Sequence, residues 1–218
     1  MHWFLETLRR FLALTPAIMV TIIAHEYPRY FLYRRLNPDR NGEVKLPSPG
    51  FFRRIDPIGL LMFYLFKFGW SRRYPVNYWK LKRKGTSRAV FTALSGLTGN
   101  LLVGVMAGVV FYVSGLSSYV TEIASGTAGS PLFSYLADVM YWIMIVNLNT
   151  ALFNILPIPP LDGSTVITII APPQYVNWLV KYELYGIIVL LALSALGIIQ
   201  MIMYPVTEFV AFLARVIS

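Results

Sequence analysis

Long apolar stretches alternate with shorter polar ones along the chain. Four of them are long enough to cross a bilayer as helices that rise about 1.5 Å per residue, namely residues 11–32, 89–114, 132–158 and 175–204. A fifth stretch, residues 57–69, is too short to cross, and we expect it to form a re-entrant or interfacial segment. The pattern predicts an all-α polytopic membrane protein with about four transmembrane helices, in which residues 1–218 form a single domain.

The stretch between the first apolar segment and the short one is polar and basic. Within residues 33–56, Asn41-Gly42 is a turn signal that stands next to a short extended piece, Glu43 to Leu46. We therefore predict a small β-hairpin at the membrane surface.

Composition and charge support a membrane location. Hydrophobic residues make up 56% of the chain and charged residues only 13%, whereas soluble domains are about one quarter charged. The net charge of +9 alone would allow a nucleic-acid partner, but 14 of the 19 Lys and Arg residues lie between Arg34 and Arg88, as is typical of a cytoplasmic face. We expect no nucleic-acid partner, a cytoplasmic basic loop at 33–88, both termini outside, and a prokaryotic inner or plasma membrane.

Two charged positions stand out against the apolar background. The stretch Asn154 to Gly163 ends an apolar segment with three prolines and then presents Asp162. This carboxylate either caps the next helix or belongs to a functional site, and we favour the site because ionisable residues near a bilayer usually face a cavity or a partner. His25 and Glu26 lie near the inner end of the first predicted span, so the predicted orientation places them at a depth similar to that of Asp162.

These residues resemble the site-2 protease family of intramembrane zinc metalloproteases. The resemblance covers most of the chain in the same order, and its most specific part is the pattern N-x-x-P-x-P-x-L-D-G at 154–163. The other matching pieces are His25-Glu26, Ile55 to Gly59, Pro75 to Asn77, Leu94 to Gly96, Gly99-Asn100 and Tyr182 to Gly186. The resemblance implies a zinc-dependent endopeptidase that cuts transmembrane segments, in which an HExxH helix supplies two His ligands and a general base, and the Asp of LDG is the third ligand.

The HExxH motif is incomplete in this chain. It reads His25-Glu26-Tyr27-Pro28-Arg29, so Arg29 stands where the second His is expected, and the chain has no Cys to replace it. Two side chains at i and i+4 share one helix face, which is why the motif needs that position to bind zinc. Zinc, if bound, would rest on His25 and Asp162 alone, with Glu26 as general base if the protein is active. Catalytic zinc normally takes three protein ligands, so the ligand set is one short.

We hypothesise that Arg29 replaces the metal electrostatically by pairing with Glu26 and Asp162. The alternative is that its long side chain reaches lipid headgroups at the inner interface. The resemblance also implies that Asn100, Asn154, Pro157 and Pro159 line a substrate cavity. The two asparagines could equally satisfy carbonyl groups freed where the helix breaks.

Three functions are consistent with these observations. The first is an active zinc-dependent intramembrane endopeptidase, with zinc as its cofactor. The second is a non-catalytic pseudoprotease without a cofactor that binds a membrane-protein substrate or a partner helix in the lipid bilayer. The third is a small transporter or channel, which the small number of predicted spans disfavours. The count of zinc ligands favours the pseudoprotease.

Overall fold

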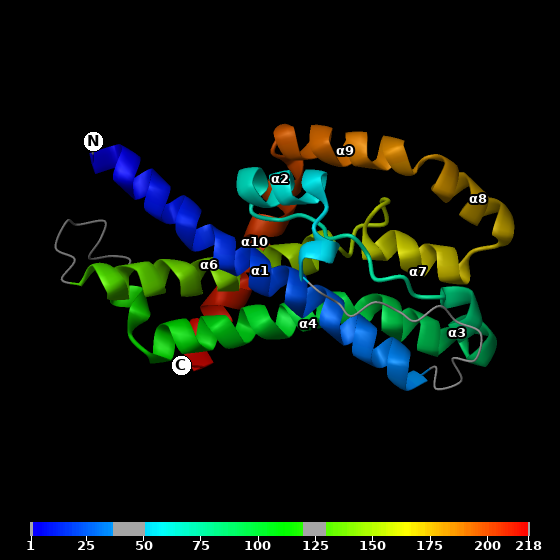
Figure 1. The fold of residues 1–218 in the computed structure, drawn as a ribbon, viewed down its shortest axis with the longest axis horizontal. Helices are drawn as coiled ribbons and strands as arrows, with labels where there is room; N and C mark the ends of the chain where they lie inside the picture. Colours follow the sequence, from blue (N-terminus) through cyan, green and yellow to red (C-terminus); the bar gives the residue numbers. More distant parts are fainter. Residues whose placement is uncertain (1, 37–50, 120–129, 218) are drawn as a thin grey trace.

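The computed structural model of the protein describes residues 2–36, 51–119 and 130–217, and every regular element in these ranges is a helix (Figure 1). The α-helices and the 3-10 helix η1 are α1 (His2–Leu36), η1 (Phe51–Arg54), α2 (Pro57–Phe66), α3 (Tyr78–Lys84), α4 (Thr86–Val113), α6 (Pro131–Phe153), α7 (Asp162–Ile170), α8 (Pro173–Lys181), α9 (Glu183–Ala195) and α10 (Ile198–Ile217). The all-α prediction is therefore confirmed for the part of the chain that is described.

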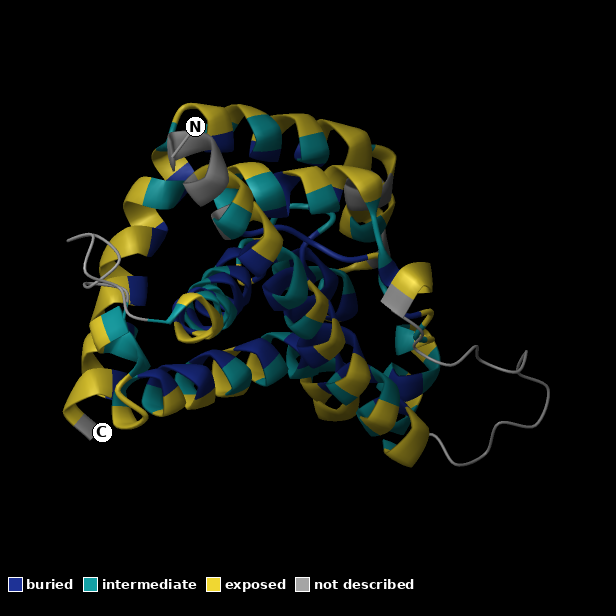
Figure 2. Ribbon diagram, turned by 60° about the vertical axis from the view of Figure 1, so that its left-hand side comes forward, coloured by how far each residue is buried: buried dark blue, intermediate teal, exposed yellow. Residues whose placement is uncertain are grey.

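Four helices are long and apolar enough to cross a membrane. They are Thr7–Leu36 in α1, Thr86–Val113 in α4, Pro131–Phe153 in α6 and Ile198–Val216 in α10. Both termini lie in the left half of Figure 1, whereas α3 and α7 lie at its right. Figure 2 shows exposed residues on the outward side of the helices. Beyond its first turn, the exposed residues of α4 are apolar apart from Thr98, as suits contact with lipid, and include Phe91, Leu102, Met106, Val110 and Val113.

The helices α1 and α4 pack closely because α4 carries glycines at the contact. A Cβ atom added at Gly99 would lie 2.1 Å from the carbonyl oxygen of Ala24, and one added at Gly96 would lie 2.6 Å from that of His25. Neither position tolerates a larger side chain without backbone movement. Small residues at helix contacts are typical of membrane proteins, and here they bring α4 against the part of α1 that carries the charged residues.

The last predicted span, 175–204, differs from the structure. Three helices share this stretch, since α8 ends at Lys181, α9 has only 13 residues, and α10 begins at Ile198. Gly197 takes a left-handed backbone conformation with φ of 74° and turns the chain between α9 and α10. The fourth candidate span therefore lies further along the chain, at Ile198–Val216. Apolar residues continue across this turn, so hydropathy alone does not reveal it.

The described residues contain no strand, so the β-hairpin prediction is not supported. Its turn at Asn41-Gly42 and the piece Glu43 to Leu46 lie outside those residues. The short apolar stretch forms α2, which begins at Pro57 with the Asp56 side chain accepting a hydrogen bond from the Gly59 N–H at 2.9 Å. The helix ends where Lys67 adopts a φ of 64°. At 10 residues it is too short to cross a bilayer.

A non-helical segment, residues 68–77, connects α2 to α3 and carries three buried aromatic side chains, Phe68, Trp70 and Tyr74. Phe68 and Trp70 pack with Met62 of α2, Phe153 of α6 and Leu190 of α9 in one hydrophobic cluster. Tyr74 belongs to a second cluster with Tyr33 of α1 and Ile169 of α7. These contacts hold the segment next to the buried face of α1.

Candidate functional site

Four charged or titratable side chains meet between α1 and the start of α7. His25, Glu26 and Arg29 lie on one face of α1 because positions i and i+4 are one turn apart. Asp162 is the first residue of α7, 133 residues away from Arg29 in the chain. All four are buried, and Arg29 has an exposed fraction of 0%. Arg29 therefore does not reach the headgroups, and the interface alternative for this side chain is wrong.

The Arg29 guanidinium lies at the centre of this cluster. Its Nη2 donates to Asp162 Oδ2 at 2.5 Å and lies 3.0 Å from His25 Nε2, and its Nη1 donates to Glu26 Oε1 at 3.2 Å. The ion pair of Arg29 with both carboxylates is thus present in the structure. One nitrogen atom of Arg29 contacts both residues that could bind zinc.

Both ring nitrogens of His25 have neighbours in this cluster. Nε2 lies 3.0 Å from Arg29 Nη2 and 3.1 Å from Asp162 Oδ2, and the Asn100 amide nitrogen lies 3.2 Å from Nδ1. Asn100 of α4 therefore orients the imidazole ring from the side opposite to Asp162.

Glu26 is bonded through both of its oxygen atoms. Oε1 accepts from the Ser71 hydroxyl at 2.7 Å as well as from Arg29, and Oε2 accepts from the Tyr74 backbone N–H at 2.8 Å. Both of the new partners come from the non-helical segment 68–77. A carboxylate with three donors has little capacity left to accept a proton from water, which a general base must do.

Asp162 is held as a carboxylate by positive neighbours. Burial alone would raise its pKa, but the Arg29 guanidinium and then His25 hold the pKa of Asp162 below its usual value. Arg73 adds a second cation beside it, because its Nη2 donates to the carbonyl oxygens of Pro160 and Leu161, the latter at 2.8 Å. Arg29 and Arg73 thus supply two positive charges beside the two carboxylates Glu26 and Asp162.

The turn before Asp162 is held by its own backbone. The Gly163 N–H donates to the Asn154 carbonyl at 2.8 Å, and a Cβ atom at Gly163 would lie 2.1 Å from the Ile155 carbonyl oxygen. The Asn154 amide donates to the Thr150 carbonyl at 2.9 Å and to that of Gly69 at 3.5 Å. The Asn154 side chain thus bonds to one carbonyl oxygen of α6 and one of the segment 68–77, in agreement with the alternative that it satisfies carbonyl groups near the helix break.

The two prolines expected at a substrate cavity lie away from the charged cluster. Pro157 is exposed, and Pro159 is half-buried with its carbonyl oxygen against α9, where a Cβ atom at Gly186 would lie 2.3 Å from it. Their role in lining a cavity stays a prediction.

The residues present do not fit a catalytic zinc ion. His25 Nε2 and Asp162 Oδ2 lie 3.1 Å apart, and Arg29 Nη2 bonds to both, so a fixed positive group fills the point at which their lone pairs converge. Zinc would need ligands at about 2.0–2.2 Å and a third protein donor. Within the described ranges, no group of three His, Cys, Asp or Glu side chains could hold a metal ion.

Sequence reasoning missed three residues of this cluster, Ser71, Arg73 and Tyr74. The run of positive charges from Arg72 to Arg88 indicates a surface loop, and that interpretation misses the half-buried Arg73 and its contacts. The aromatic residues Trp70 and Tyr74, which stand on either side of Ser71 to Arg73, are the one signal that this part of the loop is packed inside the protein.

Together, four potential membrane-crossing helices and a buried cluster built from His25-Glu26 and an LDG turn define a membrane protein related to intramembrane metalloproteases. The sequence pattern that describes Peptidase family M50 matches residues 13–194, and the chain belongs to this family. The resemblance to the site-2 proteases is thereby confirmed.

A relative from Bacillus subtilis (strain 168) bears the name "Putative zinc metalloprotease YwhC". It is 29% identical to this chain over 203 residues, which cover 89% of this chain and 87% of the relative. No solved structure gives a significant match. The family match at residues 13–194 includes both the charged part of α1 and the turn before α7, so it extends over the candidate site.

Proposed function

We propose that this protein is a non-catalytic member of Peptidase family M50 that binds transmembrane segments or partner proteins in the bilayer without cutting them. The observation that carries the proposal is the position of Arg29, whose Nη2 atom bonds to His25 and Asp162 at once. The guanidinium keeps its charge under all conditions of interest, so it occupies this position permanently. It stabilises the two carboxylates of the site without providing a Lewis acid.

The surroundings of Glu26 support the same conclusion. In an active enzyme this residue would take a proton from the attacking water, but here Arg29, Ser71 and Tyr74 all donate to it. These three donors hold both oxygen atoms of the carboxylate in place, so Glu26 has a structural role.

A groove beside the site supports a binding role. It has a volume of about 780 Å³ and runs between α1 and α4, next to Pro28 and Gly99. Phe31, Leu32 and Phe91 give it an apolar wall, which suits a transmembrane helix of a partner. In the proposed orientation the basic ends of α1 and α4 face the cytoplasm, where Arg35 and Arg88 border the same groove.

Measuring zinc per chain by elemental analysis tests the proposal. Protein purified in mild detergent without chelator is compared with Arg29→His and with Arg29→Gln, which removes the charge but adds no ligand. We expect roughly no zinc in the natural chain and in Arg29→Gln. In Arg29→His, on the order of one zinc per chain should bind, because three ligands then converge.

The control is Asp162→Ala in the Arg29→His background, in which bound zinc should fall again. Near-stoichiometric zinc in the natural chain that disappears in Asp162→Ala would contradict the proposal and favour the active endopeptidase.

A further inference from the structure

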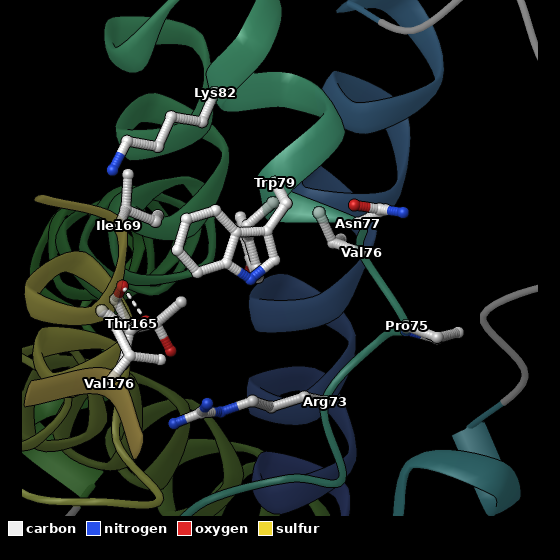
Figure 3. Close-up of a pocket in the computed structure, with 11 residues that line it drawn as sticks. Arg73, Pro75, Val76, Asn77, Trp79, Lys82, Thr165, Ile169 and Val176 are labelled. Atoms are coloured by element: carbon white, nitrogen blue, oxygen red, sulfur yellow. Dashed lines mark hydrogen bonds between the residues drawn. The ribbon is translucent and has the colours of Figure 1, made fainter. Parts of the chain in front are cut away.

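A cavity of about 610 Å³ lies between α3, α7 and the end of the non-helical segment (Figure 3). Its lining residues are Arg73, Pro75, Val76, Asn77, Tyr78, Trp79, Lys82, Thr165, Thr168, Ile169 and Val176. The volume is in the usual range for small-molecule sites, about 300–1,000 Å³.

The lining is rich in hydrogen-bond donors and carries no acidic residue. Arg73 and Lys82 supply positive charge at opposite ends of the cavity, with the Trp79 ring between them in Figure 3. The Lys82 ammonium lies 5.2 Å from the centre of the Trp79 ring, and this cation–π contact orients it. From Arg72 to Arg88 the chain has no Asp or Glu, so the local potential is positive.

Two polar atoms of the lining are buried without a partner in the described part of the chain. They are Arg73 Nε and the hydroxyl oxygen of Thr165, a residue with an exposed fraction of only 4%. A buried polar atom without a partner costs about 1–3 kcal/mol, so its presence in a native site needs an explanation. Arg73 is fixed by its bonds to the Pro160 and Leu161 carbonyls, so its Nε is held in place before any ligand arrives.

The nearby carboxylates do not supply the missing partners. Glu26 and Asp162 are both bonded to Arg29. The Asn77 side-chain oxygen accepts from the Lys80 N–H, and the Thr168 hydroxyl donates to the Thr165 carbonyl. The unpaired Arg73 Nε and Thr165 hydroxyl are therefore left for a molecule that brings acceptor atoms.

We propose that this cavity binds a phosphate ester, with the phosphate oxygens accepting from Arg73 and the Thr165 hydroxyl, and with Lys82 at the opposite end donating to an oxygen of the organic part. A phosphate has several acceptor oxygens and negative charge, which match a lining of donors and cations. The organic part of the ester packs against Trp79, Val76 and Val176. This inference does not depend on the role of Arg29, because it uses none of the bonds that Arg29 makes.

The same chemistry has two sources, a phospholipid headgroup or a soluble phosphate ester, and the experiment separates them. In the first arm, native mass spectrometry follows the retention of added phosphatidylglycerol by the detergent-solubilised chain. In the second, isothermal titration calorimetry follows the binding of glycerol 3-phosphate, the soluble fragment of that headgroup. Each arm compares the natural chain with Lys82→Gln and Thr165→Val.

The matched control is Arg83→Gln, which removes one positive charge from the same helix but outside the cavity. We expect Lys82→Gln and Thr165→Val each to weaken binding about fivefold or more, and Arg83→Gln to weaken it by less than about twofold. Binding in the first arm alone identifies a lipid ligand, and binding in the second identifies a soluble one. Absence of binding in both arms, or equal losses in Lys82→Gln and Arg83→Gln, would overturn the proposal.

Discussion

Two regions that share helix α7 differ in how their charged groups are paired. At Asp162, the first residue of the helix, Arg29 pairs with both carboxylates through Nη1 and Nη2, and only its Nε is buried without a partner in the described ranges. One turn further on, at Thr165, a buried hydroxyl and the Nε of Arg73 have none in the described ranges.

The contrast indicates which of the two regions is suited to bind a ligand. In a low-dielectric interior an unpaired polar group is costly, whereas a paired cluster rigidifies the fold. The Asp162 region has its cation built into the chain as Arg29, so it needs no metal for charge balance. The Thr165 region still lacks acceptor atoms. Mutations that disturb pairing should therefore reduce stability strongly in the first region and hardly in the second.

The largest effect is expected for Arg29→Leu. This change leaves Glu26 and Asp162 buried without their cation, and removing one partner of a buried pair typically costs about 3–5 kcal/mol. The free energy of unfolding, measured by titration with SDS from mild detergent, should fall by about that amount. Arg35→Leu, an exposed position on the same helix, is the control and should stay within about 0.5 kcal/mol. Equal losses of unfolding free energy in the two variants would mean that the buried ion pairs of Arg29 contribute no more to stability than an exposed arginine does.

Asp162→Asn should cost less, about 1.5–3 kcal/mol, because Arg29 keeps Glu26 as its counter-ion. The pKa of Asp162 is held below its usual value, so its contribution is fully present above about pH 4 and is lost as the pH falls below that. The difference in unfolding free energy between the natural chain and Asp162→Asn should therefore shrink as the pH is lowered from about 6 to about 3. A difference that stays constant over this range would contradict the assigned charge state.

Part of the charged cluster can be predicted from the sequence, because hydropathy, charge placement and helix periodicity determine where its residues lie. Positive-inside charge placement and hydropathy are enough to bring His25 and Asp162 to the same depth, and the structure has them 3.1 Å apart. The pairing of Arg29 with both carboxylates also follows from its place on the His25 face of α1. These inferences use helix periodicity, which relates residues a few positions apart, and membrane energetics, which determine the depth of a residue along the bilayer normal.

Contacts made by the non-helical segment could not be predicted in the same way. Ser71 and Tyr74 bond to Glu26 across 45 and 48 residues of chain, and no periodicity relates a loop position to a helix face. The boundary at Gly197 was missed for a related reason. Apolar residues flank this turn on both sides, so only the backbone conformation shows where α9 ends and α10 begins.

A smaller effect is expected for Ser71→Ala. The variant removes one of three donors to Glu26, and the carboxylate keeps Arg29 and the Tyr74 N–H. The expected loss in unfolding free energy is about 1 kcal/mol, the net value of one hydrogen bond. Ser114→Ala, at an exposed hydroxyl near the end of α4, serves as control and should change the value by less than about 0.5 kcal/mol. A neutral Ser71→Ala would show that the loop segment does not support the cluster.

The smallest change in unfolding free energy is expected for Thr165→Val, a variant that tests the Thr165 region. The Thr165 hydroxyl has no partner to lose, so a methyl group of the same shape should leave the unfolding free energy within about 0.5 kcal/mol or raise it. Thr207→Val is the matched control, because Thr207 is equally buried at 4% exposure but donates to the Asn149 side-chain oxygen at 2.8 Å. That variant leaves the half-buried Asn149 oxygen without this donor and should cost about 1 kcal/mol or more. If Thr165→Val costs as much as Thr207→Val in the absence of added phosphate esters, the Thr165 hydroxyl is already hydrogen-bonded within the chain. The Asp162 and Thr165 regions would then not differ in the way proposed.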